Sequence, residues 1–294
     1  MRWSIALPEP RSRHVPAAQE LAACARAVEE AGYDGVWVTD HPFPLIERGS
    51  PGHHAWDPFA SLAYVAGATE RVLLHTNLVV LPYRNPFHVA KSAATVQHLS
   101  GGRLALTLGT GYLKPEFAAL GMPFDGRDEA MRSGVEAMRA AWSGEPVHLA
   151  GRGWAAEGNT MLPAAPPHVL LRGGNSRAAI AHAAQAFDAW SPFEVAPEWA
   201  DKTHTAPLHA GEGLAEGIVA LAEAAAAAGR ERPDVWLVRP IPTWLERPRE
   251  EVRDELARLE ELGVSWIACA LGTLGSQKLD DLQRELERLT SFVR

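Results

Sequence analysis

The chain of 294 residues contains little cysteine, with Cys24 and Cys269 as its two thiols. Two cysteines are too few for a disulfide framework or a cysteine-rich metal site. Cys24 lies in a helical pattern and Cys269 in an apolar strand pattern, so we expect both to be buried as small hydrophobic residues. This usage is typical of a reducing compartment, and we therefore expect a cytoplasmic protein.

Long apolar runs are also absent, because no stretch reaches the roughly 18 apolar residues that a membrane-spanning helix needs. The opening sequence MRWSIALPEP lacks the apolar core and cleavage site of a secretory signal, so we expect none. Basic charge is not in excess: 28 Lys and Arg face 36 Asp and Glu, which gives a net charge of −8. We therefore expect no general binding to nucleic acid or to an anionic membrane, while a local phosphate pocket remains compatible.

Short apolar runs alternate with longer helical patterns along the whole chain. The runs cover residues 3–7, 35–39, 72–81, 104–108, 169–171, 187–190, 235–238 and 264–270. Most are continuously apolar, which is typical of parallel strands buried on both faces. Between the runs, apolar residues recur with a period of 3.6, as at Leu279, Leu282, Leu286 and Leu289.

Eight strand–helix units predict an α/β fold, a (β/α)8 TIM barrel that spans residues 1–294 as one domain. A doubly wound open sheet is the competing architecture. Its phosphate-binding glycines should follow the first strand, where this chain has Pro8 and Glu9 instead. Residues 145–168 are irregular, and we predict a small hairpin inserted there between helix four and strand five.

Function in such a barrel belongs at the C-terminal ends of the strands. Asp40 and His41 follow the second run and are the best catalytic candidates, because an imidazole suits proton transfer and a carboxylate can tune it or bind a cofactor. The alternative is a helix-capping aspartate beside a surface histidine. His53 and His54 lie in a loop rich in glycine and proline, where we expect them to be solvated.

A metal site is not predicted. Metal-dependent barrel hydrolases carry His-x-His at the end of strand one, and this chain has Leu-Pro-Glu at residues 7–9. His41, His53, His54 and Asp57 could be grouped, but their spacing is not that of a known ligand set.

Gly173, Gly174, Asn175 and Ser176 follow the fifth run and precede a helix, which makes them a candidate phosphate site. The glycines let a phosphate approach the backbone, and the free N–H groups of a helix start favour an anion. The alternative is a plain strand-to-helix turn that needs glycine for its geometry.

Several motifs extend these observations. They are Val36–His41, Trp56–Pro58, Thr69–Val72, Leu81–Pro86, Leu99–Leu104, Gly109–Gly111, Glu116–Phe117, Ala119–Gly121, Gly173–Ser176 and Phe187–Trp190. Together they resemble the bacterial luciferase-like monooxygenase superfamily, and most closely its coenzyme F420-dependent oxidoreductase branch. The resemblance covers most of the chain and thins after about residue 200.

The resemblance implies a flavin or deazaflavin at the C-terminal mouth of the barrel. It implies that Asp40 and His41 face the ring and that a strand-three bulge carries a non-prolyl cis peptide between Asn77 and Leu78. The cofactor-binding residues that we expect are Asp40, Thr76, Asn77, Leu78, Thr110, Gly111, Gly173, Gly174, Asn175 and Trp190. Deazaflavin-dependent sugar-phosphate dehydrogenases have an acidic proton donor directly after Gly-Thr-Gly, and this chain departs from them with Tyr112.

We therefore predict hydride transfer between coenzyme F420 and a small organic substrate, with His41 exchanging the substrate proton and Asp40 and Tyr112 assisting. Two alternatives stay open. One is an FMN-dependent monooxygenase that uses O2 and reduced flavin from a separate reductase, and the other is a non-catalytic flavin-binding subunit. Arg172 and Arg177 are candidates to bind the acidic tail of F420.

Two further expectations follow. Relatives commonly pair through the first helices of the barrel, so the resemblance implies a homodimer. The alanine-rich faces that would permit close approach contain Ala60, Ala63, Ala90 and Ala94. The substrate pocket is expected to form from the loops at 42–56, 112–125 and 191–211.

Overall fold

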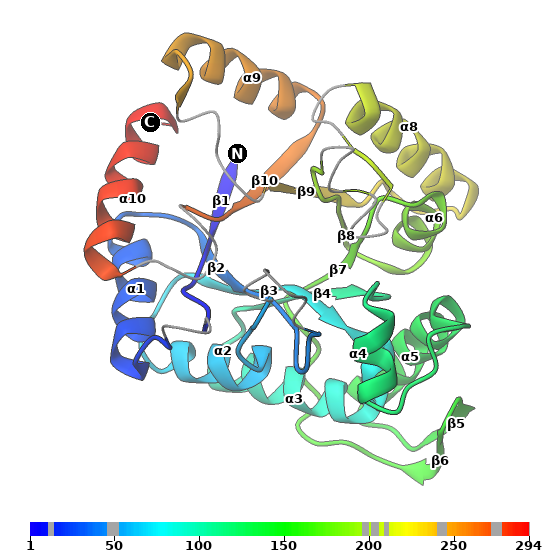
Figure 1. Cartoon of the computed structure of the whole chain (residues 1–294). Coiled ribbons are helices and arrows are strands. Elements are labelled where there is room, and N and C mark those ends of the chain that lie inside the picture. The colour runs from blue at the N-terminus through cyan, green and yellow to red at the C-terminus, as the bar shows by residue number, and fades with distance from the viewer. Residues whose placement is uncertain are drawn as a thin grey trace.

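The computed structural model describes residues 1–10, 15–45, 53–195, 200, 206–208, 212–239, 246–271 and 278–293. Eight parallel strands close into a barrel in the spatial order β1-β10-β9-β8-β7-β4-β3-β2. The strands are β1 (Arg2–Ala6), β2 (Gly35–Val38), β3 (Leu73–Val80), β4 (Leu104–Gly109), β7 (Val169–Gly173), β8 (Ala189–Ser191), β9 (Asp234–Arg239) and β10 (Val264–Cys269). Helices surround this barrel (Figure 1). The helices are α1 (Ala18–Glu30), α2 (Pro58–Ala66), α3 (Pro86–Leu99), α4 (Lys114–Ala119), α5 (Arg127–Trp142), α6 (Arg177–Ala186), α8 (Glu212–Ala227), α9 (Arg249–Glu261) and α10 (Leu279–Val293), with a 3-10 turn η1 (Leu81–Tyr83).

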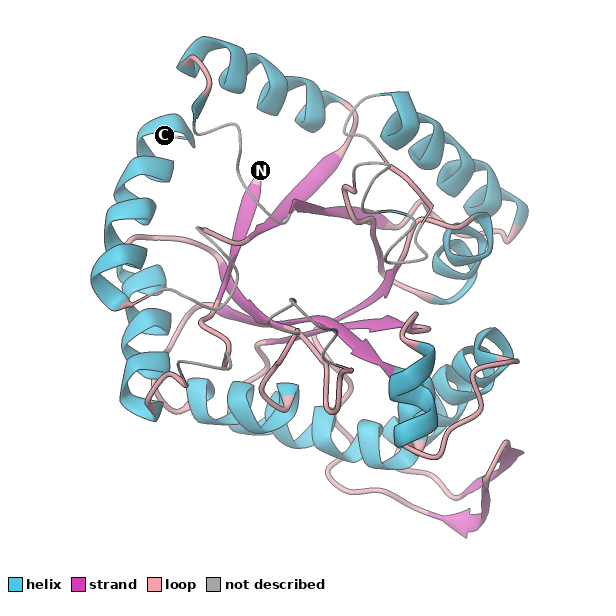
Figure 2. Ribbon diagram, in the orientation of Figure 1, coloured by secondary structure: helices cyan, strands magenta, loops and turns pink. Residues whose placement is uncertain are grey.

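A two-stranded antiparallel hairpin stands outside the barrel. It consists of β5 (Val147–Gly151) and β6 (Trp154–Asn159), which lie between α5 and β7 in the chain. Figure 2 shows it apart from the ring of strands. The barrel and the hairpin confirm both predictions about the fold: a (β/α)8 TIM barrel and an insertion within residues 145–168.

The largest apolar core lies between the barrel and its helices. The strand residues Ile5, Val36 and Leu74 point outward and are fully buried in one cluster with Leu21 of α1 and Leu62 of α2. Side chains alternate along a strand, and here the opposite face of each strand fills the barrel interior. Both faces are buried, which explains why the strands read as continuous apolar runs.

Two layers of inward-facing side chains fill the barrel. One layer consists of Ala6, Trp37, Val238, Ala268 and Ala270, and the other of Ala105, Leu171, Ala189, Trp236 and Trp266. Each layer combines indoles with alanines, so that large and small side chains complement each other. His75 packs its ring edge-on against Trp236, and its Nε2 lies 2.8 Å from the Thr107 hydroxyl. Burial lowers the pKa of His75 to about 3, so this imidazole is neutral.

The Leu-Ser-Gly-Gly-Arg motif joins α3 to β4. Its two glycines adopt φ values of 67° and 96°, which side chains with a Cβ rarely adopt. This turn directs the Arg103 guanidinium to the C-terminal end of α2. There it donates to the carbonyl oxygens of Ala66, Thr69 and Val72, and also to the Thr69 hydroxyl and the Ser100 carbonyl. The motif therefore ties a helix end to two adjacent strands.

The structure also bears on smaller predictions. Cys24 and Cys269 are buried free thiols, as predicted.

The expectation that Ala90 and Ala94 form a dimerisation surface is wrong, because both are fully buried in the core that faces the barrel. Among the described residues, no helix combines the length and apolar character needed to cross a membrane.

We predict that Arg103→Lys lowers the free energy of unfolding by about 2–4 kcal/mol, because one ammonium group cannot satisfy acceptors that lie in several directions. Urea unfolding followed by circular dichroism measures the effect. Arg71→Lys is the matched control, since the one hydrogen bond that this guanidinium makes within the described residues is a 3.4 Å contact to the Glu29 carbonyl. Equal losses in the two variants would show that the Arg103 network does not hold the helix end.

Candidate active site

His41 stands directly after β2 at the C-terminal end of the barrel, where it is 9% exposed. Its Nδ1 lies 3.1 Å from Oε2 of Glu116, a fully buried residue of α4. Two further donors reach the same carboxylate: the Tyr83 hydroxyl at 2.8 Å from Oε2 and the Phe43 N–H at 2.9 Å from Oε1. The imidazole is therefore held by a carboxylate that is itself held in place.

The charge of Glu116 follows from these contacts. Burial on its own would raise the pKa of Glu116, but the hydrogen bonds from His41, from the Phe43 N–H and from Tyr83 outweigh it, so the pKa is lowered. An ionised Glu116 accepts the hydrogen of His41 Nδ1, and we assign the tautomer from this network. Nε2 is then the nitrogen left to exchange a proton.

Asp40 does not lie open to a cofactor ring. Its Oδ2 accepts from Arg84 Nη1 at 2.5 Å and from the Val80 N–H at 2.9 Å, while its Oδ1 accepts from Arg84 Nη2 at 2.8 Å. Burial raises the pKa of Asp40, while the Arg84 guanidinium opposes that change. The pair ties the end of β2 to the end of β3, so Asp40 supports the position of His41.

A second imidazole lies beside His41. The rings of His41 and His53 have centroids 4.2 Å apart and an interplanar angle of 40°. The Nε2 of His53 lies 3.6 Å from Oε2 of Glu9, which is buried just after β1 and accepts from the Thr39 N–H and hydroxyl. The expectation that His53 is solvated holds in part: its side chain is 39% exposed, while its Nε2 is buried beside Glu9.

Tyr112 approaches the same histidine from the segment that follows β4. Its ring meets the His41 ring edge-on, with centroids 6.0 Å apart. Burial and the nearby Glu116 raise the pKa of Tyr112, so the hydroxyl keeps its proton at neutral pH. The structure thus brings the rings of His41 and Tyr112 together at the barrel mouth.

The predicted bulge interrupts β3 at this end of the barrel. The peptide between Asn77 and Leu78 is cis, as the resemblance implied, and both side chains are half-buried at the mouth. Leu78 fills the space over two glycines: a Cβ would lie 2.5 Å from its methyl groups at Gly109 and at Gly173. Thr76 is fully buried and bonds the backbone of Thr107, so it holds the bulge and does not face the mouth.

The turn after β7 fits an anion. The backbone N–H groups of residues 175–178 have no hydrogen-bond partner in the part of the chain that the structure describes. The Ser176 hydroxyl caps α6 by accepting from the Ala179 N–H at 3.1 Å. Gly174 has a φ of 118°, and a Cβ there would meet no atom closer than 3.6 Å, which leaves the backbone accessible. A helix start with free N–H groups and an open glycine is a phosphate-binding geometry.

Two side chains, those of Arg172 and Trp190, support this turn from within. Arg172 is 4% exposed, donates to the Gly173 carbonyl and makes no ion pair with any carboxylate of the described residues. Burial lowers the pKa of Arg172 to about 10, so it remains a cation at neutral pH. Trp190 is fully buried and donates its indole N–H to the Gly174 carbonyl at 2.8 Å. It therefore holds the turn in place, and the structure does not bring it to a ring pocket.

Asn175 uses its side chain elsewhere. Its amide nitrogen donates to the carbonyls of Phe193 and Ala206, and its amide oxygen accepts from the Phe193 N–H. Only its backbone N–H is therefore available to an anion at the turn.

Two predicted cofactor-binding residues, Thr110 and Gly111, follow β4, and they occupy different surroundings. Thr110 is half-buried at the mouth. Gly111 has a φ of 74°, and a Cβ there would lie 2.6 Å from Val80 and 3.0 Å from Phe117. Gly111 is therefore needed for packing behind the site.

Sequence reasoning missed five residues of this cluster. They are Glu9, His53, Tyr83, Arg84 and Glu116. Glu9 follows the first strand, so its position alone could have identified it. Glu116 lies 75 residues from His41, and no spacing in the sequence indicates that contact. Of the loops expected to form the substrate pocket, residues 46–52, 196–199, 201–205 and 209–211 lie outside the described residues.

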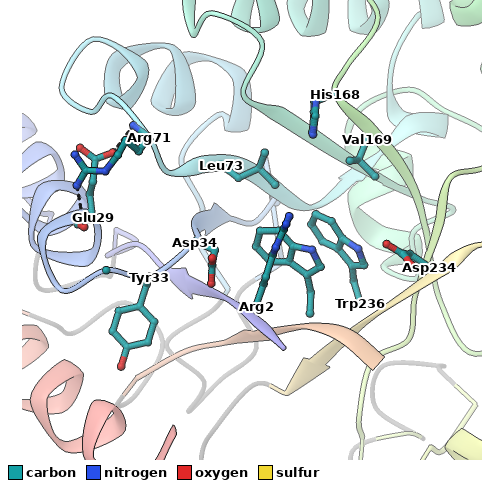
Figure 3. Close-up of a pocket in the computed structure, with 12 residues that line it drawn as sticks. Arg2, Glu29, Tyr33, Asp34, Arg71, Leu73, His168, Val169, Asp234 and Trp236 are labelled. Atoms are coloured by element: carbon teal, nitrogen blue, oxygen red, sulfur yellow. Dashed lines mark hydrogen bonds between the residues drawn. The ribbon is translucent and has the colours of Figure 1, made fainter. Parts of the chain in front are cut away.

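A pocket of about 570 Å³ lies at the opposite, N-terminal end of the barrel. Figure 3 shows Arg2, Asp34, Leu73 and Trp236 around it, from the beginnings of the strands. That end of a barrel serves stability more than chemistry, so the pocket does not compete with the His41 cluster. No group of three or more potential metal ligands occurs among the described residues.

We predict that Glu116→Gln lowers the free energy of unfolding by about 1–3 kcal/mol at neutral pH, because an amide cannot accept from all three donors. Since the folded-state pKa of Glu116 is lowered, its stabilisation is present above the unfolded pKa and is lost as the pH falls through the folded pKa. The difference in the free energy of unfolding between wild type and Glu116→Gln should therefore become smaller at acidic pH. Glu129→Gln, at an exposed position of α5, is the control. A difference in unfolding free energy that stays constant across pH would contradict an ionised Glu116.

Comparison with known proteins places this geometry in a family. The family model for the luciferase-like monooxygenases matches residues 1–286. An F420-dependent glucose-6-phosphate dehydrogenase from Amycolatopsis mediterranei is 34% identical over 137 residues, which are 45% of this chain and 40% of that protein. An uncharacterized protein from Mycobacterium tuberculosis is 27% identical over 92% of both chains. The chain thus spans less than half the length of the first relative and most of the second.

Solved structures agree on the fold. A monooxygenase from Streptomyces bottropensis superposes with a TM-score of 0.80 at 19% identity and covers 100% of this chain and 98% of its own. An F420-dependent secondary alcohol dehydrogenase, solved with an F420-acetone adduct, gives a TM-score of 0.74 at 18% identity, with both chains fully covered. With a family model that matches nearly its whole length, the chain belongs to the luciferase-like monooxygenase family.

Proposed function

We propose that this protein is an oxidoreductase that transfers a hydride between coenzyme F420 and a small organic substrate at the C-terminal mouth of its barrel. The observation that carries the proposal is the buried Glu116–His41 pair, an imidazole held by an ionised carboxylate with Nε2 left to exchange a proton. Relatives named as F420-dependent dehydrogenases support the choice of cofactor.

The residues of the mouth have distinct tasks in this proposal. His41 Nε2 takes the proton of a substrate hydroxyl, or returns it to a carbonyl oxygen, and Glu116 stabilises the resulting imidazolium. Tyr112 keeps its proton and donates a hydrogen bond to the same oxygen. When bound, the deazaflavin supplies a ring carbon that accepts or releases the hydride.

The residues of the β7–α6 turn fit a phosphate-bearing cofactor. Free backbone N–H groups lie at the start of α6, and the cation of Arg172 lies beneath Gly174, without an ion pair among the described residues. Arg172 and these N–H groups would hold the phosphate, while Asn77, Leu78 and Thr110 would lie nearest to the ring. Asp40 and Trp190 would support the site from behind.

A second candidate is an FMN-dependent monooxygenase that receives reduced flavin from a separate reductase. It rests on a monooxygenase that shares the fold of this chain, as the first candidate rests on relatives named as F420-dependent dehydrogenases. The phosphate turn serves both cofactors equally well, because FMN and F420 each carry a phosphate. Binding measurements with both separate the candidates.

We also propose a homodimer formed through α2, where Ala60 is exposed and Ala63 is half-buried. Small residues on a helix surface let a second helix approach closely. Sedimentation velocity at micromolar concentration should show a dimer for the wild type and a larger monomer fraction for Ala60→Glu. A wild-type sample that sediments as a monomer alone would contradict the proposal.

Titration with F420 and with FMN, followed by cofactor fluorescence, tests the function. We expect F420 to bind more tightly and Arg172→Gln to weaken F420 binding roughly 10-fold, since a charge–anion contact is lost. A phosphate-free deazaflavin riboside should bind wild type and Arg172→Gln alike. Arg284→Gln, at an exposed position of α10 away from the turn, is the matched control. Tighter binding of FMN than of F420 would favour the monooxygenase.

We predict that His41→Ala lowers turnover by roughly 10²–10⁴, the usual range for loss of an acid–base group. Binding of F420 should fall much less, because the phosphate turn supplies separate contacts. His98→Ala, at an exposed position of α3, should change neither quantity. Stopped-flow reduction of bound F420 by candidate alcohols measures turnover, and an unchanged rate in His41→Ala would remove this residue from the mechanism.

A further inference from the structure

An aromatic side chain lies on the barrel interior at the C-terminal mouth. Phe193 follows β8 by two residues, is half-buried, and packs against the layer of inward-facing side chains that contains Trp37 and Ala270. The Trp37 indole N–H reaches over β1 and donates to the Cys269 carbonyl of β10 at 3.1 Å. The polar atom of this indole is therefore in use, and Phe193 and the layer below it offer apolar surface.

The backbone of Phe193 is held from two sides. The Asn175 amide oxygen accepts from the Phe193 N–H at 2.9 Å, and the amide nitrogen donates to the Phe193 carbonyl at 2.7 Å. On the other side, Phe193 forms a parallel bridge with Val238 of β9, and the Glu194 N–H donates to the Val238 carbonyl at 2.8 Å. A side chain on so constrained a backbone can bind a ligand with little further loss of entropy.

The arginines at this end of the barrel are already matched. Arg84 pairs with Asp40, and Arg239 at the end of β9 pairs with two glutamates. Arg172 lies beneath the phosphate turn, where a cofactor phosphate would use it. Among the described residues, an anionic substrate group would thus find no other unpaired arginine at the C-terminal end of a strand. The ionised Glu116 would also repel such a group.

We propose that Phe193 is a specificity-determining residue, and that it selects substrates whose reacting carbon carries an uncharged apolar group. This inference rests on the proposed function, because it names the substrate class of the same site. In the oxidative direction, the alcohol carbon gives a hydride to the deazaflavin and the hydroxyl gives its proton to His41 Nε2, which leaves a ketone. The apolar group packs on the Phe193 ring and gains affinity from the surface that it buries. A carboxylate or phosphate in its place loses hydration without gaining a partner.

Two ketones that differ by one charge test this inference. Acetophenone and 4-acetylbenzoate share a ring and a carbonyl group, and the second adds a carboxylate. Their dissociation constants are measured by saturation-transfer NMR, with and without oxidised F420. We expect acetophenone to bind the wild type roughly 10-fold more tightly than 4-acetylbenzoate, and Phe193→Ser to weaken acetophenone binding by a similar factor. Equal binding of the two ketones, no binding of either, or an unchanged acetophenone affinity in Phe193→Ser overturns the proposal.

Three further variants keep the result decisive. If circular dichroism shows that Phe193→Ser does not fold, Phe193→Val shortens the apolar side chain and should weaken acetophenone binding roughly 3-fold. Phe87→Ser is the matched control, because Phe87 is also half-buried but packs against Trp154 of the hairpin. It should leave both affinities unchanged. Lys114→Gln removes an exposed cation at the start of α4. If 4-acetylbenzoate binds the wild type more tightly and Lys114→Gln abolishes that preference, a cation selects the substrate and the proposal is wrong.

The same measurements separate this inference from the proposed function. Acetophenone binding that depends on Phe193, together with no reduction of F420 by any alcohol, would refute hydride transfer and leave the apolar selection standing. Reduction of bound F420 by alcohols at rates that Phe193→Ser does not change would leave hydride transfer standing and refute the selection.

Discussion

The chemistry at the mouth depends on where the chain places one buried carboxylate, that of Glu116. Helix α4 has six residues and cannot hold a position by its own stability, since isolated short helices are marginal. The residue that follows Glu116 in this helix, Phe117, is fully buried against Tyr83 and Phe124. The ring centroids of these two residues lie 4.6 and 5.2 Å from that of Phe117. Gly111 leaves the space that this phenyl ring occupies. An aromatic cluster therefore fixes the helix, the helix fixes Glu116, and Glu116 fixes the imidazole of His41.

The barrel could be predicted from the sequence because each of its strands and helices has a recognisable pattern of neighbouring residues. Each strand is buried on two faces and appears in the sequence as an apolar run. In each helix, apolar residues recur with the helical period of about 3.6 residues. The same reasoning placed His41, Tyr112, Gly173 and Gly174 at the C-terminal ends of strands, where the structure also has them, since position at a strand end is visible along the chain. The Asn77–Leu78 bulge came from the resemblance and not from periodicity.

The sequence could not show which way a side chain points at a strand end. Thr76 and Asn77 are neighbours, yet the first is fully buried and bonds the backbone of Thr107, while the second is half-buried. Trp190 sits between two small inward-facing residues and so turns outward to the helices. Contacts across long stretches of chain were equally invisible: His41 meets Glu116, 75 residues away, because the segments after β2 and β4 lie at the same end of the barrel.

The distribution of buried cations supports a ligand at the β7–α6 turn independently of any relative. Arg84 and Arg239 are also buried or half-buried at strand ends, and each is paired with carboxylates, Asp40 for the first and Glu194 and Glu255 for the second. Arg172 is buried without such a pair in the described chain, and burial lowers its pKa to about 10. Asp128 offsets part of this burial from a distance, but a buried charge without a contact ion pair still lowers the stability of the folded state. A bound anion removes part of that cost, so that anion binding at the turn and folding of the chain are thermodynamically linked.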